Sequence, residues 1–68
     1  MKIIRVKGNL PGYNVEVNIY VNLEQITFIA PGPNGWQINL GGSYFETNND
    51  GYDVIFRALH PLIERADQ

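Results

Sequence analysis

The stretch from Val15 to Asn22 constrains the fold of this chain more than any other. Valine or isoleucine alternates there with mostly polar residues without a break: Val15, Val17, Ile19 and Val21 with Glu16, Asn18, Tyr20 and Asn22. Successive side chains of a strand leave the backbone on opposite sides, so this pattern predicts a strand with one buried and one wet face. We expect the valine face to pack on the core.

Four further segments have the composition of strands and are separated by turn signals. We predict strands over residues 2–7, 15–22, 26–30, 36–40 and 43–47. Pro11-Gly12 is the signature of a type II turn, residues 31–35 combine two prolines with Asn-Gly, and Gly41-Gly42 forms the last reversal. Asn22 is placed to cap a single helical or 3₁₀ turn between two strands.

The last part of the chain predicts one helix. Asp50 is the expected N-cap, with Asn48 or Asn49 as alternatives. Apolar residues then recur at spacings of three and four, which is the pattern of one helical stripe: Tyr52, Ile55, Phe56, Leu59, Leu62, Ile63 and Ala66. Pro61 removes a backbone donor, so the helix should kink or stop near His60, and we favour a kink or a short second turn.

These elements predict an α+β fold in one small domain, residues 1–68. Every connection between strands is short, which favours antiparallel neighbours. We expect a strongly twisted five-stranded antiparallel meander, curled toward a small barrel, with the helix closing one face.

The length of the chain limits the stability that one core can supply. A 68-residue domain buries only roughly 60% of its unfolded surface, and domains of this size often depend on disulfides, a metal or a partner subunit. The sequence has no cysteine and one histidine, His60, so we expect no metal and no cofactor. Self-association to a homo-oligomer is therefore expected, with a small monomer as the alternative.

Catalytic residues are not recognisable in the sequence. His60 has no nucleophile or second ligand beside it, and Ser43 has no partnered base. Asp50 and Asp53 lack the ligand pattern of a calcium loop and fit helix capping better. We therefore predict that the protein is not an enzyme.

The wet face of the alternating strand is the first candidate site. A tyrosine among amides and a carboxylate is typical of interaction surfaces, because such side chains combine contact area with hydrogen bonds. The predicted protein-binding residues are Glu16, Asn18, Tyr20 and Asn22.

A second set of residues would suit a nucleotide or nucleic acid. The chain carries five basic and seven acidic residues, a formal charge of −2, whereas binders of nucleic-acid backbones are normally basic over one face. A small basic strip with stacking aromatic residues would still serve. The residues predicted for such a contact are Arg5, Lys7, Tyr13, Trp36, Asn39 and Tyr44.

Residues 21–59 resemble the small FlbD/SwrD-like proteins of flagellar loci and similar tiny β-rich proteins of phages and mobile elements. The resemblance is carried by an Ile-rich strand, a hairpin, a glycine turn, an aromatic-bearing strand and a capped helix, at these positions: Val21-Asn22, Ile26, Ile29, Ile38, Leu40, Gly41, Tyr44 and Val54-Ile55. The first hairpin through Pro11-Gly12 is longer than in that pattern. The resemblance implies a non-enzymatic, cytoplasmic protein that acts through interactions.

The leading hypothesis from the sequence is thus a small interaction module that self-associates and binds a protein partner through a sheet face or edge. A nucleotide or nucleic-acid binder of the phage-inhibitor type and a structural assembly component are the alternatives. No apolar run approaches the about 18 residues that a membrane span needs. We expect a soluble cytoplasmic protein with no membrane partner, which the absence of cysteine fits.

Overall fold

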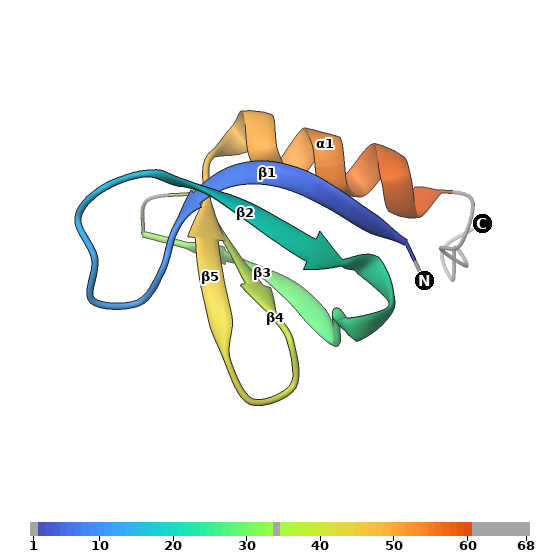
Figure 1. Ribbon diagram of the computed structural model, residues 1–68, viewed down its shortest axis with the longest axis horizontal. Helices are drawn as coiled ribbons and strands as arrows, with labels where there is room; N and C mark the ends of the chain where they lie inside the picture. The colour runs from blue at the N-terminus through green and yellow to red at the C-terminus, as the bar shows by residue number, and fades with distance from the viewer. Residues whose placement is uncertain (1, 34, 61–68) are drawn as a thin grey trace.

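The computed structural model describes residues 2–33 and 35–60 of the chain. These residues form one antiparallel sheet and one helix, which lies along one side of the sheet (Figure 1). The elements are β1 (Ile3–Asn9), β2 (Val17–Asn22), the 3₁₀ turn η1 (Leu23–Gln25), β3 (Phe28–Gly32), β4 (Gly35–Asn39), β5 (Tyr44–Thr47) and α1 (Asn49–Leu59). The predicted five-stranded antiparallel α+β fold is confirmed.

The strands are arranged in the order β2-β1-β5-β4-β3, in an open sheet that does not close into a barrel. The order therefore departs from a meander in chain order at one place, because β2 and β3 lie at opposite edges and β5 pairs with β1. That pairing is short and joins Gly8 to Thr47 and Asn9 to Glu46. A side chain at Gly8 would collide with the backbone oxygen of Glu46, so glycine permits the close approach.

Local turn chemistry behaves as the sequence predicts. In the loop between β1 and β2, Gly12 has φ of 83° and the Tyr13 N–H donates to the Leu10 oxygen at 3.0 Å, which are features of a type II turn. Asn22 caps η1, because its Oδ1 accepts from the Glu24 N–H at 3.1 Å. This turn takes the chain out of the sheet after β2 and lets it return at the other edge.

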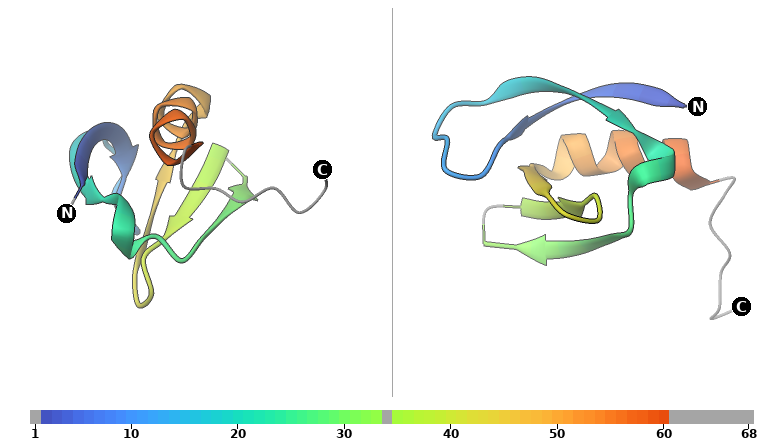
Figure 2. Two further views of the ribbon diagram at one scale, coloured as in Figure 1. Left: turned by 90° about the vertical axis from the view of Figure 1, so that its right-hand side faces the viewer. Right: turned by 60° about the horizontal axis from the view of Figure 1, so that its bottom comes forward.

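The core lies between the helix and the concave side of the sheet. Its fully buried apolar members come from six elements, one residue from each: Val6, Val21, Leu23, Ile38, Phe45 and Ile55. Figure 2 shows α1 between β1 on one side and β4 on the other, where it covers the space that opens as β1 and β5 diverge. Tyr52, Phe56 and Leu59 of the predicted stripe are half-buried.

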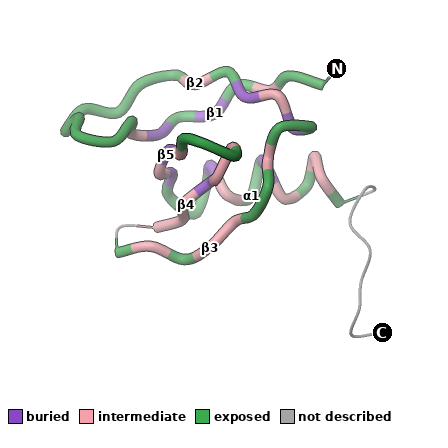
Figure 3. Tube along the Cα trace, turned by 90° about the horizontal axis from the view of Figure 1, so that it is seen from below, coloured by how far each residue is buried: buried purple, intermediate pink, exposed green. Residues whose placement is uncertain are grey.

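The valine face of β2 is only partly buried, which corrects the sequence-based expectation. Val21 is 3% exposed, but Val17 is 37% and Val15 is 61% exposed. The strand also begins at Val17 rather than at Val15. The reason is geometric, because this end of the hairpin extends beyond the helix and the other strands, and Figure 3 shows its loop exposed throughout.

The N-cap of the helix lies two residues before the expected cap, Asp50. Asn48 is the N-cap, with its Oδ1 accepting from the Gly51 N–H at 2.9 Å, so Asp50 lies inside the first turn. Asn48 was the alternative to Asp50 in the sequence prediction. The helix ends at Leu59, and the predicted kink at Pro61 lies outside the described residues.

Candidate functional site

The outward face of the β1–β2 hairpin gathers the exposed polar side chains of two strands. The register places Arg5 opposite Tyr20 and Lys7 opposite Asn18. All four are exposed, and Tyr20 is 68% exposed, the largest value among the exposed large apolar and aromatic residues of the described chain. The strand pairing holds their backbones in place, so this face presents its groups on a fixed scaffold.

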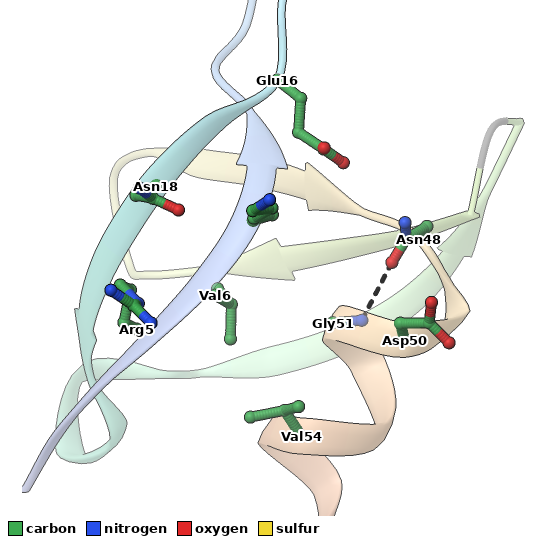
Figure 4. Close-up of a pocket in the computed structure, with 9 residues that line it drawn as sticks. Arg5, Val6, Glu16, Asn18, Asn48, Asp50, Gly51 and Val54 are labelled. Atoms are coloured by element: carbon green, nitrogen blue, oxygen red, sulfur yellow. Dashed lines mark hydrogen bonds between the residues drawn. The ribbon is translucent and has the colours of Figure 1, made fainter.

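The same face continues into a groove between the hairpin and the start of α1 (Figure 4). The groove has a volume of about 380 Å³ and is lined by two cations, two carboxylates and two amides among other residues: Arg5, Lys7, Glu16, Asp50, Asn18 and Asn48. The positive and negative formal charges are equal in number. Within the described residues none of these four charged groups has an ion-pair partner, so each can pair with a charge on another molecule.

The four residues predicted for protein binding therefore divide into two groups. Glu16 and Asn18 line the groove, and Tyr20 lies beside them on the open face. Asn22 is half-buried and its side chain caps η1. Asn22 thus has a local structural role and contributes least to the exposed face.

The six residues predicted for a nucleotide or nucleic-acid contact are not brought together. Arg5 and Lys7 line the groove, and Tyr13 lies in a neighbouring hollow that Glu16 also lines. Asn39 and Tyr44 face each other across β4 and β5.

Trp36, the last of these six residues, stacks on the helix instead. Its ring lies 4.0 Å from that of Tyr52 at an angle of 13°, and Tyr52 in turn stacks on Phe56 at 5.7 Å. The Trp36 Nε1–H donates to Asn49 Oδ1 at 3.0 Å. This row of aromatic rings was not predicted from the sequence. The spacing of four between Tyr52 and Phe56, which places both on one helix face, was the signal that could have revealed it.

The aromatic row forms one wall of a second, mainly apolar groove. This groove lies between β3 and α1, has a volume of about 320 Å³, and is also lined by Ile26, Ile29 and Leu59. Phe28 at its rim is 58% exposed although it belongs to a strand. Two surfaces of different chemistry therefore lie on the molecule, one mixed in charge and one apolar.

Neither groove brings together a set of metal ligands among the described residues. In residues 2–33 and 35–60, no three His, Asp or Glu side chains come together as metal ligands. Every buried side-chain nitrogen and oxygen in this part of the chain has a hydrogen-bond partner. Thr47, the one buried polar residue of the core region, is satisfied because its hydroxyl donates to the Lys7 oxygen at 2.7 Å.

No helix among the described residues has the length and apolar character needed to cross a bilayer. Comparison with protein-family models, with curated proteins and with solved structures finds no match for this chain.

Proposed function

We propose that this protein is a non-enzymatic interaction module that binds a protein partner through the outward face of the β1–β2 hairpin. The observation that carries the proposal is Tyr20, which is 68% exposed and lies across from Arg5 in the middle of that face. Tyrosine and arginine are the residue types that most often anchor protein interfaces. A tyrosine held on a paired strand also loses little conformational freedom on binding.

The mixed charges of the neighbouring groove favour a polar protein surface as the partner. Arg5 and Lys7 offer donors, while Glu16 and Asp50 offer acceptors, within one groove. A surface that carries both signs selects a partner with the complementary arrangement and repels others. The side-chain amides of Asn18 and Asn48 line the same groove. Each amide can both donate and accept hydrogen bonds, so it can pair with a donor or an acceptor of the partner.

Self-association is part of the proposal, and so is a cytoplasmic location. The small core supports the first, because a chain of 68 residues gains stability from a subunit interface. The absence of cysteine fits the second. The resemblance of residues 21–59 implies a non-enzymatic protein that acts through interactions, and such a module is compatible with it.

Nucleotide or nucleic-acid binding is the second candidate and has weaker support. Arg5 and Lys7 share their groove with Glu16 and Asp50, which repel phosphate. The ring of Trp36 lines the other groove and already packs on Tyr52. A salt-sensitive thermal shift with nucleotides or short oligonucleotides, weakened by Arg5→Ala, would favour this candidate over a protein partner.

Site-specific photo-cross-linking in the source cell tests the protein-partner proposal. A benzophenone amino acid replaces Tyr20 in one version and Phe28 in a matched control, since both side chains are exposed and lie on strands at opposite edges. We expect one defined cross-linked protein from position 20 and not from position 28. Arg5→Ala in the same chain should reduce its yield several-fold. Equal products from both positions, or none from position 20, would refute the proposal.

A further inference from the structure

The two edges of the sheet differ in how they are protected. β3, at one edge, contains Pro31, and Pro33 follows it directly. Proline has no N–H to offer a neighbouring chain, and its presence is a common device against edge pairing. β2, at the other edge, has neither proline nor lysine in its six residues and lies on the outside of the molecule in Figures 1 and 2.

The free edge of β2 has a defined set of backbone groups. The Leu23 N–H donates to the Lys2 oxygen at 2.8 Å, in phase with the β1–β2 register. Hydrogen-bonded and non-hydrogen-bonded pairs alternate in an antiparallel ladder. Ile19 and Val21 therefore direct their N–H and C=O groups to β1. Asn18 and Tyr20 direct theirs away from the sheet, where no described strand pairs with them.

We infer that two copies of this chain pair antiparallel through β2, with Asn18 opposite Asn18 of the second copy. The inference rests on the self-association in the proposed function and deepens it by naming the strand and the register. The two five-stranded sheets would join into one continuous sheet about a twofold axis, which is the commonest symmetry of homodimers.

The register follows from which residues must face each other. Residues whose amides point outward have to oppose one another, so a twofold axis passes through a residue, and near the middle of the stretch this is Val17, Asn18, Ile19 or Tyr20. An axis at Val17 places Val21 opposite Tyr13, which lies in the loop before β2. An axis at Asn18 places Val17 opposite Ile19 and Val15 opposite Val21 of the second copy. An axis at Ile19 or Tyr20 leaves Val15 without a strand residue to face, because η1 begins at Leu23.

The exposed valines support the axis at Asn18. Val15 and Val17 are 61% and 37% exposed in the single chain, although they continue the face that contributes the buried Val21. Pairing at Asn18 gives both valines an apolar neighbour from the second copy. It also extends β2 back to Val15, over the full length of the alternating sequence.

The charges of the outward face are compatible with the same register. Glu16 comes to lie opposite Tyr20 of the second copy, and that tyrosine has Arg5 as its other neighbour. A carboxylate of one copy and a cation of the other then flank each Tyr20. The joined face of four adjacent strands carries two copies of the partner-binding residues, so that one dimer presents a doubled surface.

Cysteine cross-linking tests the strand and the register together. The chain has no cysteine, so an introduced thiol reacts without background. Opposed Cα atoms of a hydrogen-bonded pair lie about 5.5 Å apart, within the roughly 4.4–6.8 Å that a disulfide spans. Asn18→Cys should therefore form a disulfide dimer under mild oxidation. Tyr20→Cys should not, because its two copies would lie about 13 Å apart along the strands.

The cysteine cross-linking experiment includes a control variant and a mixture of two variants. Phe28→Cys places an exposed thiol on the opposite edge strand and measures chance collisions. We expect Asn18→Cys to cross-link about tenfold faster or more, because pairing raises the local thiol concentration from micromolar toward millimolar. A mixture of Glu16→Cys and Tyr20→Cys should also cross-link, since these two positions oppose each other in this register.

Two results would overturn the inference. A strict monomer by sedimentation of the unmodified chain at about 100 μM, far above the dissociation constant of a specific dimer, would refute pairing through β2. Tyr20→Cys that cross-links as fast as Asn18→Cys would refute the register. Partner binding is tested separately, by photo-cross-linking from position 20 to another protein. Neither of the two results above changes that product, so a failure of the dimer can be told apart from a failure of partner binding.

Discussion

Small residues determine how closely α1, β1 and β5 approach one another. A Cβ at Gly51 would collide with the Thr47 hydroxyl and come within 3.3 Å of the Lys7 oxygen, and Gly8 lies against the backbone of Glu46. The Thr47 hydroxyl in turn donates to the Lys7 oxygen. The start of the helix, β1 and β5 therefore meet at one tightly packed point. Glycine is required at position 51 by this contact and not by helix propensity, which it lowers.

Gly51→Ala is predicted to destabilise the protein although alanine is the better helix former. The new methyl group must displace Thr47 or the first turn of α1, and overpacking of this kind costs about 1–3 kcal/mol in the free energy of unfolding. Urea denaturation measures the change. Gly42→Ala is the control, because a Cβ there meets nothing within 4 Å, and it should stay within about 0.5 kcal/mol. A stabilised Gly51→Ala protein would contradict the packing described.

At the scale of single elements, the sequence predicts the type of each helix or strand better than the residues at which it begins and ends. The alternation from Val15 correctly indicates a strand, but the strand begins at Val17 because no part of the same molecule covers Val15. The hydrophobic period and the residue propensities of a segment indicate which secondary structure it can form. Where the segment begins depends on neighbours that only the folded molecule supplies.

The helix N-terminus gives a second example of this limit. Asn48, Asn49 and Asp50 are all good capping residues, so sequence alone leaves the choice among them open. Packing of Gly51 against Thr47 fixes the position of the first turn, and with it Asn48 as the cap. Asn49 then becomes the acceptor for Trp36.

Substitutions at the cap should separate these roles. Asn48→Ala removes the acceptor for the Gly51 N–H and is expected to lower the free energy of unfolding by about 1 kcal/mol at any ionic strength. Asp50→Asn removes only a favourable charge near the helix dipole, so its smaller effect, about 0.3–1 kcal/mol, should fade as salt is added. Chemical denaturation at low and high salt measures both. Asp50→Ala also removes the side-chain acceptor at position 50, and a loss in high salt as large as that of Asn48→Ala would show that Asp50 is the cap.

The aromatic row on α1 can be tested with the single tryptophan as a reporter. Tyr52→Leu keeps an apolar side chain but removes the one ring that stacks on both Trp36 and Phe56, so we expect the free energy of unfolding to fall by about 1–2 kcal/mol. Emission of Trp36 should shift to longer wavelength as water reaches its ring. Tyr13→Leu, at an exposed loop position, is the control and should change neither quantity. An unchanged Trp36 spectrum in Tyr52→Leu would argue against the stack.

At the scale of the whole molecule, the strand order is the part that sequence could not predict. Each hairpin is signalled locally by glycine, proline and asparagine, and those turns appear where they were predicted. The pairing of β5 with β1 depends on Gly8, Glu46 and Thr47, which are far apart in the chain and have no local signal. The composition of the hairpin face was likewise predictable from alternation, whereas its junction with the groove at Asn48 and Asp50 was not.

A dimer through β2 predicts a stability that depends on protein concentration. The thermal midpoint should rise between about 1 and 100 μM, because association stabilises the folded state by mass action. Asn18→Pro should remove that dependence yet keep the monomer fold, since the Asn18 N–H points to the free edge and not to β1. Circular dichroism followed at several concentrations measures both. A midpoint independent of concentration in the unmodified chain would contradict the dimer.

The short β1–β5 pairing also has a consequence for the rate of folding. The β1–β2 hairpin and the β3–β4–β5 meander each close over short loops and can form on a timescale of about 1–10 μs. The Thr47 hydroxyl and the Lys7 oxygen, in contrast, are 40 residues apart in sequence, and closing so long a loop costs entropy before any contact offsets it. Docking of the hairpin on the meander therefore depends on one contact between residues that are far apart in the sequence. The speed at which this small protein folds is expected to be limited by the meeting of Gly8 with Thr47.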